Sequence, residues 1–87
     1  MIEKDLIIHP GETIKEIILD RNMTQEELAV RTDYSLKHVS EVISGKKVIS
    51  SRLADALEYA LGIPFEFWIN LQEIYDKKYI KVKFRRN

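Results

Sequence analysis

The segment from Thr24 to Gly45 constrains the fold of this chain more than any other part of its sequence. It predicts two short helices. Thr24 can cap the first, with Glu27 completing a capping-box pattern, and Ser35 can cap the second. The second helix has one apolar face, made by residues at helical spacings: Val39, Val42 and Ile43. Residues 32–34 are expected to form the turn between the helices, so the segment predicts two helices crossed over a short connection.

Two helices joined in this way form the helix-turn-helix motif, in which the second helix enters the major groove of DNA. The face of the second helix opposite its apolar side is therefore the face expected to meet DNA. It carries Leu36, Lys37, Ser40, Glu41 and Ser44. The pattern predicts duplex DNA as the ligand.

Three side chains on this face suit the edges of bases. Lys37 can donate to guanine, Glu41 can accept from the N4 of cytosine, and Leu36 can contact the methyl group of thymine. Lys37 and Glu41 lie one helical turn apart, so an ion pair between them is the alternative interpretation.

Other residues suit the DNA backbone. Gln25 begins the first helix of the pair, where its amide and the helix N-terminus can both face a phosphate. Ser35 and Ser40 can reach phosphates or base edges. Lys46 and Lys47 directly follow the second helix and are expected to contact phosphates irrespective of sequence.

The charge distribution fits a nucleic-acid ligand better than the net charge of zero does. Residues 1–45 carry nine acidic and five basic residues, whereas residues 46–87 carry nine basic and five acidic residues. The tail at residues 77–87 contains six of these basic residues and no acidic residue.

The composition also excludes several classes of protein. A chain of 87 residues predicts one small domain, 1–87, with a core at 9–76 and the basic tail at 77–87. It has no cysteine, and His9 lies far from His38 in sequence, so no metal or cofactor is expected. A cytoplasmic protein is expected because the N-terminus is not a signal peptide and no apolar run suits a membrane. No set of catalytic residues is visible, so an enzyme is not expected.

Three more helices complete the predicted all-α fold. Pro10 opens one that ends near residues 20–22, Ser50 caps another that Gly62 ends, and Pro64 opens the last. In the tail, apolar Ile80, Val82 and Phe84 alternate with polar residues. This period of two predicts a short C-terminal strand, which would need a partner strand to be stable. A disordered tail and a continuation of the last helix are the alternatives.

The last helix carries more aromatic residues than so small a core requires. The surplus predicts an interface with a second copy or with another protein. The residues assigned to it are Phe67, Trp68, Leu71 and Tyr75, with Ile80, Val82 and Phe84 of the tail.

Several motifs together point to one family. They are HPGE at residues 9–12, TQEELA at 24–29, LGIP at 61–64, FWINLQ at 67–72 and the pair Tyr75-Asp76. With these motifs the chain resembles the HigA (VapI-like) antitoxins, helix-turn-helix proteins of the Xre/lambda-repressor superfamily. The similarity covers residues 8–76, and its most specific parts are the HPGE motif and the signature FWxNLQxxYD at residues 67–76.

The resemblance implies a five-helix lambda-repressor-like domain that forms a homodimer and binds a palindromic operator upstream of its own operon. It also implies a partner, a HigB-type toxin of the RelE-like class of ribosome-dependent mRNA endonucleases, which the antitoxin neutralises. The family's base-reading positions fall on Leu36, Lys37, Ser40 and Glu41, and its backbone positions on Gln25, Ser44 and Lys46. A strand at residues 79–84 would suit the edge of a toxin's sheet, or a second copy, and the N-terminal segment at residues 1–8 is a rival contact for the toxin. The basic residues of the tail would instead suit operator phosphates.

The sequence departs from the family pattern at three positions. Asp33 replaces the usual turn glycine, although aspartate tolerates the left-handed conformation better than most residues. Thr32 replaces an apolar residue, and Glu41 stands where a basic or amide residue is common.

Three alternative functions stay open at this level. The chain could be a phage- or plasmid-type repressor without a toxin, the DNA-binding domain of a larger regulator, or a protein-binding module without DNA. A small basic gene directly upstream would favour the antitoxin over a plain repressor. A test of operator binding distinguishes the DNA-binding functions from a protein-binding module without DNA.

Overall fold

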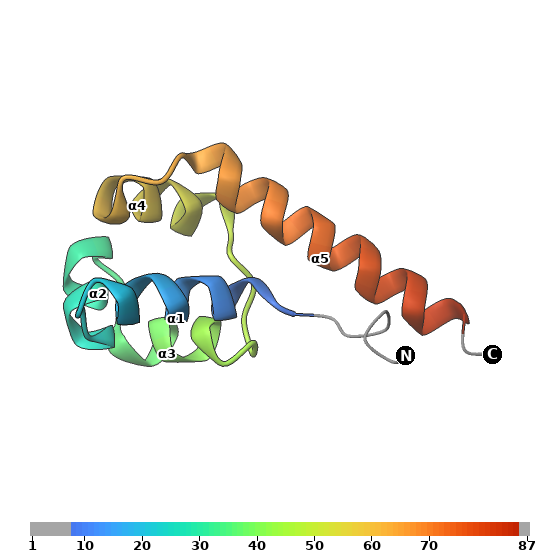
Figure 1. The fold of residues 1–87 in the computed structure, drawn as a ribbon, viewed down its shortest axis with the longest axis horizontal. Helices are drawn as coiled ribbons and strands as arrows, with labels where there is room; N and C mark the ends of the chain where they lie inside the picture. Colours follow the sequence, from blue (N-terminus) through green and yellow to red (C-terminus); the bar gives the residue numbers. More distant parts are fainter. Residues whose placement is uncertain (1–7, 86–87) are drawn as a thin grey trace.

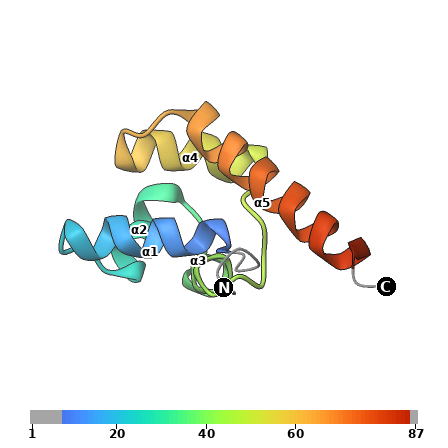
Figure 2. The same ribbon diagram turned by 45° about the vertical axis from the view of Figure 1, so that its right-hand side comes forward.

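The computed structural model describes residues 8–85, with side chains described to Lys78, and within that range it consists of helices and their connections. The helices are α1 (Pro10–Asp20), α2 (Gln25–Thr32), α3 (Leu36–Ile43), α4 (Ser51–Leu61) and α5 (Phe65–Arg85). As Figure 1 shows, α3 packs against both α1 and α2, while α4 covers α2 and α5 packs on α4 and α1. The second half of α5 extends past the rest of the domain in both Figure 1 and Figure 2. The five predicted helices are confirmed.

The helices begin where the sequence supplies a side-chain oxygen or nitrogen for the free backbone N–H groups. The predicted N-caps accept hydrogen bonds of 3.0–3.1 Å from the backbone N–H three residues later: Thr24, Ser35 and Ser50. Each bond satisfies one of the amides that a helix leaves without a partner at its start. The Glu27 carboxylate bonds to Arg31, one turn further along α2, at 2.9 Å.

The turn between α2 and α3 shows how the two unusual residues are accommodated. Asp33 adopts the left-handed conformation, with φ of 63° and ψ of 34°, as the sequence predicts. Thr32 is buried, and its hydroxyl donates to the carbonyl oxygen of Leu28 at 2.8 Å. The polar side chain therefore fits an apolar site without an unpaired donor.

A hydrophobic core joins all five helices, and Trp68 is the largest of its fully buried side chains, with an exposed fraction of 0%. Its indole Nε1 donates to the carbonyl oxygen of Ile63 at 3.2 Å, so its polar atom is also satisfied. The assignment of Trp68 to an interface is therefore wrong, because the fold of a single copy already buries it completely.

The predicted C-terminal strand is wrong as well. The backbone of residues 79–85 continues α5, which was one of the alternative interpretations. Successive residues of a helix turn by about 100°, so alternate residues do not share a face as they would in a strand. The side chains assigned there to an interface lie outside the described ones: Ile80, Val82 and Phe84. None of the described helices has the length and apolar character needed to cross a membrane.

Candidate nucleic-acid interface

Most of the predicted DNA-contacting residues gather on one side of α3. Six of them line one shallow, open depression: Leu36, Lys37, Ser40, Glu41, Ser44 and Lys46. We call this set the α3 surface. The opposite side of α3 is buried in the core, which fixes the rotation of the helix. Leu36 is 43% exposed although it is apolar, so this side chain remains available for a ligand.

The other three predicted residues border this surface or lie apart from it. Lys47 contacts Glu41 at the edge of the depression. Ser35 caps α3 and lines, with Leu36, a second open depression at the turn between α2 and α3. Gln25 is half-buried as the first residue of α2, where free backbone N–H groups also point outward. His38, also on α3, is half-buried, and its ring lies 4.7 Å from that of Tyr34.

The charges on the α3 surface pair differently from the sequence-based alternative. Glu41 Oε1 lies 3.8 Å from Lys47 Nζ, and no pair between Glu41 and Lys37 is found among the described side chains. The backbone explains the difference. The carbonyl oxygen of Glu41 accepts from the backbone N–H groups of Lys46 and Lys47, at 2.8 and 3.2 Å. The basic loop therefore folds back over the last turn of α3 and brings Lys47 to the carboxylate.

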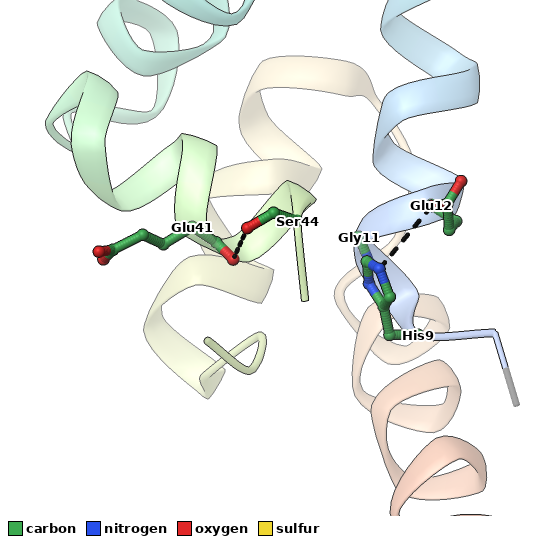
Figure 3. Close-up of polar contacts among 5 residues, drawn as sticks. All are labelled: His9, Gly11, Glu12, Glu41 and Ser44. Carbon is green, nitrogen blue, oxygen red and sulfur yellow. Dashed lines mark hydrogen bonds and ion pairs between the residues drawn. The ribbon is translucent and has the colours of Figure 1, made fainter. Parts of the chain in front are cut away.

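The start of α1 holds the C-terminal end of α3. A Cβ atom on Gly11 would lie 2.1 Å from the carbonyl oxygen of Val42 and 2.7 Å from that of Ile43. Only glycine permits this approach of two helices, because the neighbouring atoms belong to the backbone. Figure 3 shows His9 and Gly11 beside the end of α3 that bears Ser44.

His9 completes this contact. Its Nδ1 accepts from the backbone N–H of Gly11 at 3.1 Å and so caps α1. The same ring faces Gly45, where a Cβ atom would lie 2.8 Å from it, and its Nε2 lies 3.8 Å from a Glu12 carboxylate oxygen. The HPGE motif therefore positions α3. This role was not predicted from the sequence, although the adjacent proline and glycine were the available signal.

The loop after α3 is held from the other side by Gln72 of α5. The Gln72 side chain is 7% exposed, and its Oε1 accepts from the backbone N–H of Ile49 at 2.9 Å. Its Nε2 donates to Asp76 at 2.9 Å. Gln72 belongs to the FWINLQ motif, but its role of fixing the basic loop was also not predicted, since that role depends on a contact between residues 23 positions apart.

A second exposed surface lies on α5. Phe67 is 41% and Ile74 is 52% exposed, and Leu71 and Tyr75 are half-buried. Phe67, Leu71 and Ile74 are spaced by four and three residues, so they share one side of the helix. We call these three residues the α5 face. Phe67, Leu71 and Tyr75 were among the residues predicted for an interface, whereas Ile74 was not.

Comparison with known proteins agrees with this architecture. The model of the helix-turn-helix family (HTH_3) matches residues 14–68. The chain is 36% identical over 69 residues to virulence-associated protein A' of Dichelobacter nodosus, a match that covers 78% of this chain and 60% of that protein. The chain thus spans about 60% of the length of this relative.

Two solved structures extend the similarity to the whole fold. An addiction module antidote protein of the HigA family from Coxiella burnetii is 33% identical, with a TM-score of 0.76, covering 83% of this chain and 79% of that one. The Pseudomonas aeruginosa antitoxin HigA, solved with the higBA promoter, is 28% identical, with a TM-score of 0.78, covering 82% and 78% of the two chains.

Proposed function

Because this chain belongs to the helix-turn-helix family, and within it to the HigA-type antidote proteins, we propose that it is the antitoxin of a toxin–antitoxin module. In this proposal it represses its own operon by binding a palindromic operator and neutralises a HigB-like, RelE-like mRNA endonuclease toxin. The α3 surface is the observation that best supports the proposed operator binding. It collects lysines and hydrogen-bonding side chains on the exposed side of the second helix of a helix-turn-helix.

The α3 surface suits the major groove in its chemistry. Lys37 donates to the O6 and N7 of guanine, and Leu36 contacts a thymine methyl group. Ser40, near the middle of the exposed side, reaches a base edge or a phosphate. These contacts supply sequence specificity, because the pattern of donors, acceptors and methyl groups differs between base pairs there.

Backbone contacts set the position of α3 in the groove. Lys46 and Lys47 neutralise phosphates next to the end of α3. Ser44, the residue directly after α3, contacts the DNA backbone beside them. Gln25 and the start of α2 bind a second phosphate, since helix N-termini favour anions. His9, Gly11 and Gln72 act indirectly, by holding α3 and the basic loop in one arrangement.

The α5 face and the proposed palindromic operator both support a homodimer. Two recognition helices one turn of DNA apart read a palindrome, so one copy is insufficient. The α5 face offers exposed apolar area from Phe67, Leu71 and Ile74 for the contact between copies. We propose that this face, without Trp68, forms the dimer interface, and that Tyr75 borders it.

The DNA-binding part is tested by measuring affinity for the region upstream of the gene against a random duplex of equal length. The wild type should prefer the upstream duplex, and Lys37→Ala should weaken that preference by about 1–3 kcal/mol. Lys15→Ala, which removes an exposed lysine from α1, is the matched control and should leave the preference intact. Equal affinity of the wild type for both duplexes would refute the repressor function.

The toxin part is tested by co-expression. If a small basic protein is encoded next to this gene, its expression alone should arrest growth, and co-expression of this chain should remove that effect. Co-purification of the two proteins should accompany the rescue. If the chain binds its operator but rescues no neighbouring toxin, it is a repressor without a toxin partner.

A further inference from the structure

The α3 surface contains one carboxylate among cations, and that carboxylate should be unfavourable near DNA. Glu41 is the acidic residue of the depression that Lys37 and Lys46 also line. Every phosphate repels it, so it weakens the sequence-independent attraction that the lysines supply. Its presence on the face that meets DNA therefore calls for a role that a neutral side chain would not fulfil.

The structure keeps Glu41 extended and accessible. Its carboxylate points away from α1 in Figure 3, and the side chain is 27% exposed. Its partner Lys47 is 48% exposed and 3.8 Å away. An exposed ion pair of this kind is weak, so a phosphate can compete for Lys47 when DNA approaches. The carboxylate would then be left facing the base edges.

A carboxylate on a base edge accepts hydrogen bonds and donates none. In the major groove the amino groups of cytosine and adenine are donors, whereas the N7 and O6 of guanine and the O4 of thymine are acceptors. A carboxylate therefore attracts the first pair of bases and repels the second. Adenine also presents the acceptor N7 beside its amino group, so cytosine is the better match.

We propose that Glu41 is a further specificity-determining residue of this surface, selecting cytosine and rejecting guanine and thymine at one position of each half-site. Lys47 acts as its counter-ion in the free protein and moves to a phosphate in the complex. This inference rests on the proposed operator binding and assigns a sequence preference to it. Lys37 and Glu41, one helical turn apart, then contact different bases. Lys37 donates a hydrogen bond to guanine, and Glu41 accepts one from cytosine.

The variant Glu41→Gln separates charge from size. Glutamine donates as well as accepts and suits adenine, so the variant should tolerate bases that the wild type rejects. It should also bind random duplex more tightly, because one negative charge near the phosphates is gone. The backbone bonds of residue 41 to the basic loop are unchanged by the substitution. The matched control is Asp55→Asn, which makes the same change of charge on an exposed position of α4.

The experiment is selection from a library of randomised duplexes with the full chain, followed by affinities for the best wild-type site and its single-base variants. We expect the wild type and Asp55→Asn to enrich the same palindrome and to lose about 5- to 150-fold in affinity when one cytosine is replaced by guanine. Glu41→Gln should reduce that loss to less than about threefold. Lys47→Ala should keep the preference for cytosine over guanine. It should reduce the slope of the logarithm of affinity against the logarithm of salt concentration by about 0.9 for each copy bound.

Three results would overturn parts of this account separately. Enrichment of the same site with undiminished discrimination by Glu41→Gln would refute the specificity role while leaving operator binding intact. An unchanged salt slope for Lys47→Ala would refute the movement of Lys47 to a phosphate. Failure of the folded wild type to enrich any site would refute the proposed DNA-binding function itself.

Discussion

The substitution Gly11→Ala tests whether the contact between α1 and α3 fixes the recognition helix. The added Cβ atom would meet three backbone atoms: the carbonyl oxygens of Val42 and Ile43, and the Cα of Ile43, at 2.1, 2.7 and 2.8 Å. Backbone atoms cannot rotate away as side chains do. To bring the shortest contact to 3.4 Å, where ordinary van der Waals contact begins, α1 and α3 must separate by about 1.3 Å.

The size of the effect follows from that separation. Overpacking of a well-packed core typically costs about 1–3 kcal/mol, and a backbone clash belongs at the upper end, near 3 kcal/mol. In a domain of this length, that loss lowers the melting temperature by about 12–24 °C. Domains are typically stable by about 5–15 kcal/mol, so the variant should still fold at 25 °C.

Gly62→Ala is the matched control, because it lowers the free energy of unfolding for a different reason. Gly62 has φ of +75°, and a Cβ atom there would have no other atom within 4 Å, so alanine suffers backbone strain but no clash. That strain costs about 1–2 kcal/mol. Urea unfolding of both variants measures the difference. Operator affinity, measured where both are folded, should fall for Gly11→Ala and not for Gly62→Ala. If Gly11→Ala is no more destabilising than the control and binds the operator as the wild type does, the contact between α1 and α3 does not fix the recognition helix.

Two further substitutions test the loop anchor and the α5 face. Gln72→Leu should lower the free energy of unfolding by about 1–3 kcal/mol in urea, because it leaves the backbone N–H of Ile49 buried without an acceptor; a change near zero would contradict the anchoring role. Ile74→Asp should shift the chain from dimer to monomer in sedimentation at micromolar concentration, whereas Tyr59→Asp, at a position 87% exposed on α4, should not. Equal behaviour of these last two variants would place the dimer interface elsewhere.

The helices of this fold follow from local chemistry, which is why the sequence predicts them well. N-caps at Thr24, Ser35 and Ser50 act within three residues, and the apolar periodicity of α3 shows which of its sides is buried. The left-handed Asp33 is also a local effect. The side of α3 that carries the candidate DNA contacts could therefore be inferred without coordinates.

The sequence-based predictions are wrong where tertiary contacts determine whether a side chain is exposed or which partner it has. Nothing local distinguishes Trp68, fully buried, from Phe67, 41% exposed, because the choice depends on how α5 lies on the core. The alternating residues of the tail suggested a strand, yet the backbone there continues a helix that is already established over many turns. Glu41 pairs with Lys47 because the loop folds back over α3, a path that spacing along a helix does not reveal.

We expect α3 and the loop after it to form the surface that meets DNA. Amide chemical-shift mapping by NMR, during titration with the selected operator duplex, tests this expectation most directly. We expect the largest changes at residues 36–47 and at the start of α2, with little change over residues 51–61 of α4. Changes concentrated on α4, with residues 36–47 unaffected at saturation, would contradict the account.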